Sequence, residues 1–191
     1  MTEAPVGAGR KQLLFIALVF FGPLLFAGWL YYSGALLQPG NRTNHGALLQ
    51  PLVNLDEVMP ESPLRPLHED QWLLVLSESG PCADDCRQAL YNMRQMRLML
   101  GKEMDRLGRI LLHGETAPDT VFPGAEYPGL ILVEDGALAE LLQESTPAGQ
   151  ESGGYYLVDP LGNLVMYFAP DLAPDHIVSD IKQLLKLSHI G

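Results

Sequence analysis

Apolar residues form one long uninterrupted run near the N-terminus. Residues 13–32 (LLFIALVFFGPLLFAGWLYY) contain no charged side chain. Twenty helical residues at 1.5 Å each span roughly 30 Å, which is the thickness of a bilayer core. The pattern therefore predicts a transmembrane helix at residues 13–32, in which Pro23 is tolerated.

The charges on either side of this run predict its orientation. Arg10 and Lys11 precede it, no basic residue follows until Arg42, and aromatic residues gather at positions 29–32. Because basic residues stay on the cytoplasmic side and aromatic residues mark the interfaces, we expect residues 1–12 to lie in the cytoplasm.

Two targeting signals compete with the anchor interpretation. A cleaved signal peptide has an apolar region of about 7 to 15 residues, shorter than this run, and residues 33–35 (SGA) make only a passable cleavage site. A mitochondrial presequence is disfavoured because Glu3 is acidic and only two basic residues precede the run. We therefore expect an uncleaved anchor.

Proline is frequent in the segment that follows. Residues 33–69 hold five of the fifteen prolines. This composition predicts an extended stalk that holds the next domain away from the membrane. Within it, the apolar residues at 47–53 are a candidate for one short strand.

Residues 70–191 alternate between strand-like and helix-like patterns. Short continuous apolar runs such as 72–76 (WLLVL) predict buried strands, whereas apolar residues at three- and four-residue spacing predict amphipathic helices. The alternation predicts an α/β sandwich of few strands. The expected elements are strands at 72–76, 109–112, 130–133, 155–158 and 164–168 and helices at 83–107, 137–143 and 174–187.

Net charge excludes one class of partner. The 191 residues include 23 acidic and 12 basic side chains, a formal charge of −11. This balance excludes a nucleic-acid binder that relies on neutralising phosphates. From Ser33 onward the chain carries ten basic and 22 acidic side chains, a net charge of −12, which suits a basic partner or a solvated surface.

The candidate chemistry lies in the two cysteines. Cys82 and Cys86 form a C-x3-C pattern between the first expected strand and the long helix. The positive end of a helix favours a thiolate there, whereas the charges of Asp84 and Asp85 oppose it. The spacing allows either a disulfide or the clamping of one soft metal ion.

A purely structural bridge is the alternative for this pair. A disulfide that closes a five-residue loop stabilises a fold by only about 2 kcal/mol in the chain-entropy model, less than a long-range bridge does. We therefore favour Cys82 and Cys86 as functional thiols over a structural or vestigial pair.

Several short motifs together resemble the Sco/SenC family, and most closely its short membrane-anchored members encoded with cytochrome c oxidase assembly genes in proteobacteria. The likeness covers nearly the whole chain. The motifs are NHGALLQP (44–51), the cysteine pattern with CRQALY (86–91) and MRQ (93–95), YLVDP (156–160), GN (162–163), YF (167–168) and SHIG (188–191).

The resemblance implies a thioredoxin-like α/β sandwich at residues 70–191, held in the periplasm by one span in the bacterial inner membrane. It implies a role in cytochrome c oxidase assembly, with an oxidase subunit or other assembly factors as partners. The Cys82/Cys86 pair would deliver Cu(I) to the dinuclear copper centre or reduce cysteines there. The alternative is a catalytically silent scaffold that binds assembly partners.

One position departs from the Sco pattern. The histidine that serves as third copper ligand precedes the Tyr156 strand by five residues, and here that position is Glu151. A carboxylate is a hard ligand poorly suited to Cu(I). The third ligand is therefore unknown, and the alternatives are His45, His68, His113, His176 and His189.

Other candidate residues have simpler interpretations. His113 follows a predicted strand, and we expect it to be an exposed loop residue. The stripe of Met93, Met96 and Met99 favours core packing over copper binding. Tyr127-Pro128 precedes a strand near the cysteines, as the cis-proline of thioredoxins does, but most X-Pro bonds are trans.

Overall fold

The computed structural model describes residues 6–32, 44–78, 80–114, 127–188 and 190. The chain divides into two compact units between Thr43 and Asn44. The first contains helix α1 (Val6–Tyr32), whose segment Lys11–Leu30 has the length and composition needed to cross a membrane. Pro23 lies inside this helix, as expected.

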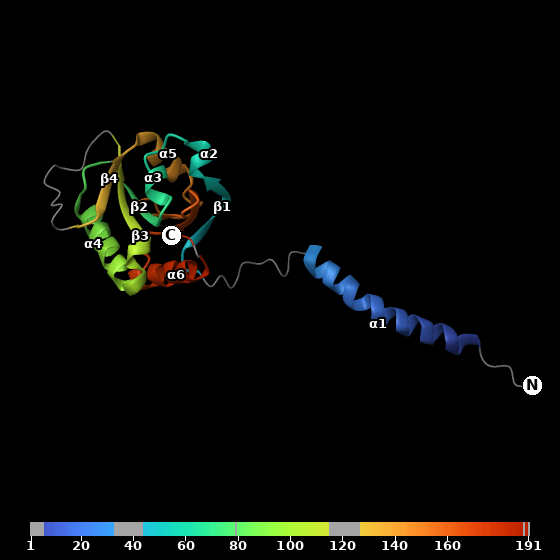
Figure 1. The fold of residues 1–191 in the computed structure, drawn as a ribbon. Helices are drawn as coiled ribbons and strands as arrows, with labels where there is room; N and C mark the ends of the chain where they lie inside the picture. The colour runs from blue at the N-terminus through green and yellow to red at the C-terminus, as the bar shows by residue number, and fades with distance from the viewer. Residues whose placement is uncertain (1–5, 33–43, 79, 115–126, 189, 191) are drawn as a thin grey trace, which may run out of the picture. The chain divides into compact units, whose positions relative to one another are not determined.

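The second unit is a six-stranded sheet with helices on both faces (Figure 1). The strand order is β1-β6-β5-β2-β3-β4, with β2, β3 and β4 parallel and the other neighbouring pairs antiparallel. Its elements are β1 (Ala47–Asn54), α2 (Leu55–Val58), α3 (Arg65–His68), β2 (Trp72–Glu78), α4 (Asp84–Met99), η1 (Gly101–Arg106), β3 (Leu107–His113), β4 (Leu130–Glu134), α5 (Gly136–Glu144), β5 (Tyr155–Val158), β6 (Asn163–Phe168) and α6 (Pro174–Leu187).

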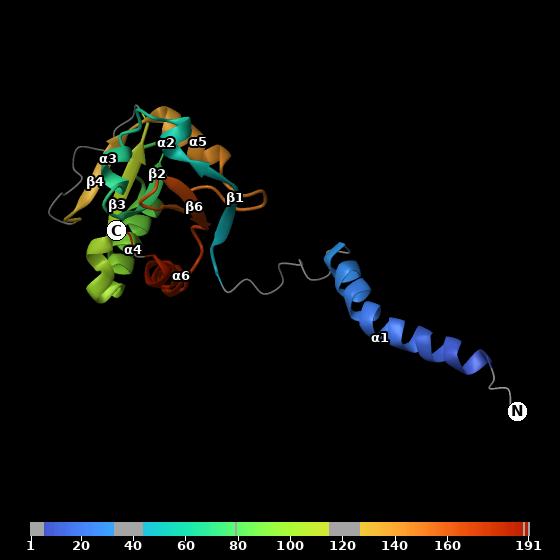
Figure 2. The same ribbon diagram turned by 45° about the vertical axis from the view of Figure 1, so that its right-hand side comes forward.

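Each face of the sheet buries its own hydrophobic core. Figure 2 shows α4 and α6 on one side of the sheet and α2 and α5 on the other. Along β2, Leu74 and Leu76 face α4, while Leu73 and Val75 face the opposite layer. Because both faces are covered, the strand is apolar throughout, which is why it could be predicted from a continuous run.

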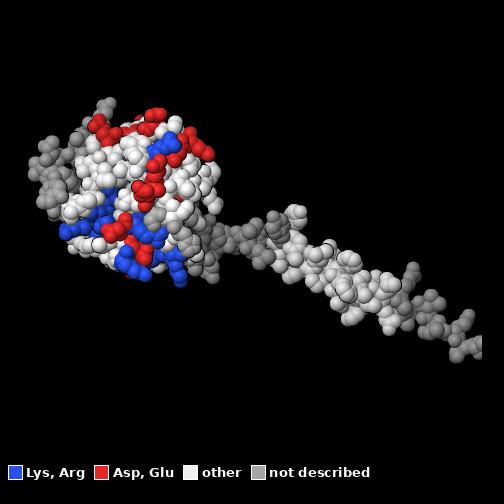
Figure 3. Space-filling model, viewed as in Figure 1, with Lys and Arg blue, Asp and Glu red and all other residues white. Residues whose placement is uncertain are grey.

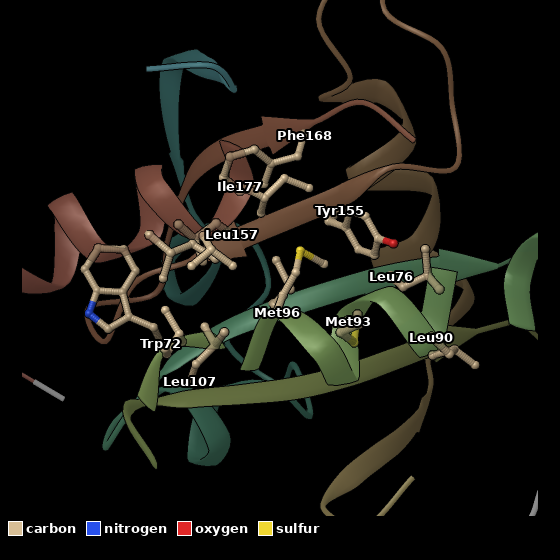
Figure 4. Close-up of a cluster of buried hydrophobic side chains, with 14 of the residues drawn as sticks. Trp72, Leu76, Leu90, Met93, Met96, Leu107, Tyr155, Leu157, Phe168 and Ile177 are labelled. Carbon is tan, nitrogen blue, oxygen red and sulfur yellow. The ribbon is translucent and has the colours of Figure 1, made fainter. Parts of the chain in front are cut away.

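The methionines of α4 belong to the core on the α4 side. Met93 and Met96 are fully buried there, with Trp72 and Leu107 among their neighbours in the cluster (Figure 4). Met99 is 45% exposed at the end of the helix. The packing interpretation of the methionine stripe is confirmed for Met93 and Met96.

The expected stalk is wrong from residue 44 onward. β1 pairs with β6, and the two short helices that follow bury Leu55, Leu64 and His68 against the sheet. Pro51 has no backbone N–H to donate. Because β1 is an edge strand with one neighbour, the missing donor does not prevent strand formation. The short strand considered at residues 47–53 is confirmed.

The long helix expected at residues 83–107 is shorter in the structure. α4 ends at Met99, and a 3-10 helix (η1) leads into β3 at Leu107. Gly101 has a φ of 63°, a left-handed conformation that ends the regular helix. The other expected strands and helices are confirmed to within two residues at each end.

Candidate functional site

Cys82 and Cys86 form a disulfide at the start of α4. The turn after β2 leads to Cys82, and Cys86 lies in the first turn of the helix. Their Cα atoms are 5.1 Å apart, within the range that a disulfide requires. Both residues are buried, with Cys82 8% and Cys86 4% exposed. Of the two uses that the spacing allows, the structure shows the bridge.

The backbone beside the disulfide is held by Arg87. Its guanidinium donates to the carbonyl oxygen of Cys82 at 3.3 Å and to Asp84 Oδ1 at 2.6 Å. The Asp84 charge thus has a cation beside it.

A cleft of about 460 Å³ opens beside Cys86. Apolar atoms of Leu76, Ala89 and Tyr155 lie in its wall, and polar side chains surround them. The lining residues that can ionise to carboxylates are Glu78, Asp85, Glu151 and Asp171. The site is thus a disulfide at the wall of an acidic cleft.

Tyr167 and Gly154 position the loop that carries Glu151. The Tyr167 hydroxyl donates to the carbonyl oxygen of Glu151 and accepts the N–H of Gly154 at 3.1 Å. A Cβ at Gly154 would clash with the carbonyl oxygen of Phe168, so only glycine fits this approach. Burial raises the pKa of the Tyr167 hydroxyl, which keeps it protonated and able to donate.

Tyr155 connects the cleft to the core. Its hydroxyl donates to the carbonyl oxygen of Ala89 at 3.0 Å, and the side chain packs in the cluster under α4 (Figure 4). Burial raises the pKa of Tyr155 to about 12, partly offset by a hydrogen bond with Asn92. Tyr155 is therefore neutral at physiological pH and acts as a fixed part of the cleft wall.

Glu151 and Cys86 both line the cleft. The donor set around the cysteines is two sulfurs and carboxylates, and the residues lining the cleft include no histidine. In the described part of the chain, no group of three or more His, Cys, Asp or Glu side chains could hold a metal ion. Soft Cu(I) is poorly matched to these hard oxygen donors.

His113 is not the exposed loop residue that we expected. It is the last residue of β3, is 7% exposed, and its Nδ1 lies 2.8 Å from the carbonyl oxygen of Gly114. The strand continues through His113 because it pairs with Glu78 of β2 and Glu134 of β4 on either side. His113 lies one strand away from Glu78 and does not line the cleft.

The other histidines that the structure describes do not line the cleft. His68 is buried with its Nε2 3.0 Å from Asp56 Oδ1, and the exposed His176 stacks on His45 with ring centroids 4.1 Å apart. His189 lies outside the described residues.

The cis peptide bond among the described residues is Gln50-Pro51, so Tyr127-Pro128 is trans.

Glu78, Tyr155 and Asp171 are among the cleft residues that sequence reasoning missed. Glu78 had a detectable signal, because it ends the strand immediately before the cysteine turn. Asp171 had none, since it is brought to the cleft by the β6–α6 connection from 85 residues beyond Cys86 in the chain.

Comparison with known families agrees with this architecture. Residues 72–188 match the family described as transmembrane-like, thioredoxin-like, C-terminal domain, which is more than half of the chain. The chain belongs to this family. Residues 5–34, which contain α1, match the transmembrane-like, N-terminal domain. A search of curated proteins finds no match.

Two solved structures share the fold of this thioredoxin-like domain. Copper-bound ScoI from Arabidopsis thaliana superposes with a TM-score of 0.51 at 16% identity, over 65% of this chain and 89% of that chain. Apo Sco1 from Thermus thermophilus superposes with a TM-score of 0.53 at 18% identity, over 76% of this chain and 99% of that chain. The predicted Sco-like thioredoxin fold is confirmed.

Proposed function

We propose that this protein is a membrane-anchored thiol–disulfide exchange factor that assists cytochrome c oxidase assembly through Cys82 and Cys86. The observation that carries the proposal is the disulfide at the wall of the cleft, with Cys86 among the lining residues. A client segment that enters the cleft would lie beside Cys86.

The exchange step conserves atoms and electrons. A thiolate of the reduced pair attacks a client disulfide, one client sulfur leaves as a thiolate, and a mixed disulfide forms. The second cysteine then attacks that bond. The client gains two electrons and two protons as a dithiol, and the Cys82–Cys86 disulfide reforms. The reverse sequence oxidises a client dithiol.

The cleft supports exchange more than copper delivery. Solved Sco relatives include a copper-bound form, which makes Cu(I) a candidate cargo. Glu151, at the position where the Sco resemblance expects the third ligand, lines the cleft with a carboxylate, which is a hard donor for Cu(I). Thiol–disulfide exchange needs no third ligand, because it proceeds by attack of one thiolate on a disulfide sulfur.

Localisation follows from α1. Its length and composition and the family match at residues 5–34 support a single membrane span, and the resemblance to the Sco family implies the bacterial inner membrane. With Arg10 and Lys11 before the apolar segment, the N-terminus is cytoplasmic and the thioredoxin-like domain periplasmic. That compartment is oxidising, so a disulfide there can persist.

A redox titration of the full chain in detergent distinguishes exchange from a silent scaffold. We expect the Cys82–Cys86 disulfide to be reversible, with a reduction potential above about −300 mV. Inert structural disulfides have reduction potentials below that value. The variants Cys82→Ser and Cys86→Ser should remain folded, with a loss of about 2 kcal/mol, and lose exchange. A bridge that resists reduction, or a much larger loss of stability, would favour the structural role.

The client assignment has a separate test in cells. Deletion of the protein should lower the copper content of the oxidase, and the Cys82→Ser variant should fail to restore it. Restoration by that variant would favour a scaffold that needs no thiol.

A further inference from the structure

The cleft beside Cys86 is lined by charged residues of one sign. Glu78 comes from the end of β2, Asp85 from the first turn of α4, Glu151 from the loop before β5, and Asp171 from the connection between β6 and α6. The residues lining the cleft include no Lys, Arg or His. Four separate segments therefore bring carboxylates to the disulfide.

These carboxylates are not neutralised within the described part of the chain. None of the ion pairs there involves Glu78, Asp85, Glu151 or Asp171. By contrast, Asp84 on the other side of the disulfide is paired with Arg87. The negative charge of the cleft is thus available to a partner.

Most basic residues of the domain lie away from the cleft, and Arg87, which follows Cys86, is paired with Asp84. Figure 3 shows Lys and Arg gathered over the part of the surface formed by α4, η1 and α6. The residues that supply this charge are Arg94, Arg97, Lys102, Arg106, Lys182 and Lys186. No basic side chain lies in the cleft wall to shield its field.

A bound metal ion does not explain the carboxylates, because no group of three or more described ligand side chains could hold one. The volume of about 460 Å³ is instead within the range of sites that enclose a ligand group. Leu76, Ala89 and Tyr155 add apolar surface for the stem of a long side chain.

We infer that the cleft selects clients whose cysteine-bearing segment carries Lys or Arg beside the cysteine. This inference rests on the proposed exchange function and names its substrate class. The disulfide alone sets where the reaction occurs, and the carboxylates set the charge of the segment that can lie there. A cleft lined by one sign of charge focuses its field and raises the rate at which oppositely charged partners associate.

Two disulfide-bonded peptides with identical sequences except for Lys or Glu next to the cysteines provide the probe. The full chain, reduced beforehand by a chemical dithiol that is then removed, transfers two electrons to the peptide disulfide. The peptide leaves as a dithiol, and the Cys82–Cys86 disulfide forms. We expect the Lys peptide to react about tenfold faster at low ionic strength, with the advantage falling towards parity in high salt.

Neutralising variants connect the selectivity to the cleft. Glu151→Gln combined with Asp171→Asn should reduce the ratio of the Lys-peptide rate to the Glu-peptide rate severalfold. The matched control is Glu61→Gln combined with Glu69→Gln, which removes two exposed negative charges away from the cleft and should leave the ratio unchanged. The ratio is the readout because any change in thiol pKa affects both peptides equally.

The possible outcomes separate this inference from the function on which it rests. If neither peptide reacts, the exchange function fails. If both react at equal rates, or if the control variant lowers the ratio as much as the cleft variant does, exchange stands and the charge selectivity is overturned.

Discussion

At the scale of a single residue, we expect Glu151 to determine whether the site can hold Cu(I). Its side chain is exposed in the cleft, while its backbone is held by the Tyr167 hydroxyl. A replacement at this position therefore changes the donor atom and leaves the loop attached. The cysteines supply two soft donors when reduced, and a third soft or borderline donor depends on this one side chain.

We predict that Glu151→His raises the Cu(I) affinity of the reduced protein by roughly tenfold or more, because imidazole suits copper better than a carboxylate does. A competition titration against a Cu(I) chelator measures the change. The control is His113→Ala, which should have no effect, since His113 does not line the cleft. His113 would instead be the third ligand if the unmodified protein bound Cu(I) tightly, Glu151→His left that affinity unchanged and His113→Ala lowered it.

We predict that the buried hydroxyl of Tyr155 makes the folded domain less stable in alkaline solution. Its pKa is about 12 in the folded protein, above the ordinary value of 10.0. Between these values the unfolded chain loses the proton first, so the free energy of unfolding falls as pH rises from 10 to 12, by about 3 kcal/mol for this residue. Tyr156 and Tyr167, whose pKa values are also raised by burial, act in the same direction.

Tyr155→Phe should make this alkaline loss shallower, because one of the buried hydroxyls no longer titrates. At neutral pH the variant should lose about 1 kcal/mol with the hydrogen bond to Ala89. Unfolding of the full chain in detergent, measured from pH 8 to 12, tests both parts. An unchanged slope above pH 10 would contradict the role of Tyr155.

At the scale of elements, Asp180 of α6 binds the backbone of residues 45 and 46, which precede β1. This aspartate is 3% exposed and accepts the backbone N–H groups of His45 at 2.7 Å and Gly46 at 2.8 Å. Its second oxygen lies 3.0 Å from His45 Nδ1. One carboxylate thus ties the residues that precede β1 to a helix more than 130 residues later in the chain.

We predict that Asp180→Ala lowers the free energy of unfolding by about 2 to 4 kcal/mol, because it leaves two backbone donors without their acceptor. Asp180→Asn, which keeps an acceptor oxygen but loses the charge, should cost less. Asp175→Asn on the exposed part of α6 is the control and should change stability little. Thermal unfolding ranks the three variants, and equal losses for Asp180→Ala and Asp175→Asn would contradict the anchoring role.

At the scale of the whole molecule, the two compact units differ in whether their apolar side chains are buried. Residues 13–32 carry no charge, whereas the unit from Asn44 onward has its own hydrophobic cores on both faces of its sheet. The second unit therefore buries its apolar surface by itself, whereas α1 leaves its large apolar side chains exposed. We expect the second unit to fold independently of a membrane around the first.

We predict that residues 44–191 expressed alone are soluble and unfold at the same temperature as the domain in the full chain, because the core lies within that unit. The full chain should remain in membranes and retain its N-terminal residues, and a reporter after Gly191 should be active only outside the cytoplasm. Fractionation, N-terminal sequencing and reporter activity are the measurements. A mature chain that begins after residue 35 would instead identify α1 as a signal peptide.

Periodicity alone determined most elements of the fold. The apolar runs at 72–76, 109–112 and 130–133 and the amphipathic pattern at 174–187 are local signals, because the period of two or 3.6 residues is set by backbone geometry. The charge-free run at residues 13–32 and the C-x3-C pattern can likewise be recognised from neighbouring residues alone. These features could be predicted without knowing which segments pack together.

Tertiary structure alone decided the extent of the domain and the character of the site. Residues 44–69 looked like a stalk because proline lowers local strand and helix propensity, yet pairing of β1 with β6 and the carboxylate of Asp180 bring them into the domain. Likewise, Glu78, Asp85, Glu151 and Asp171 become one acidic cleft only after folding. Contacts between residues far apart in sequence depend on the three-dimensional path of the chain, and no local pattern encodes that path.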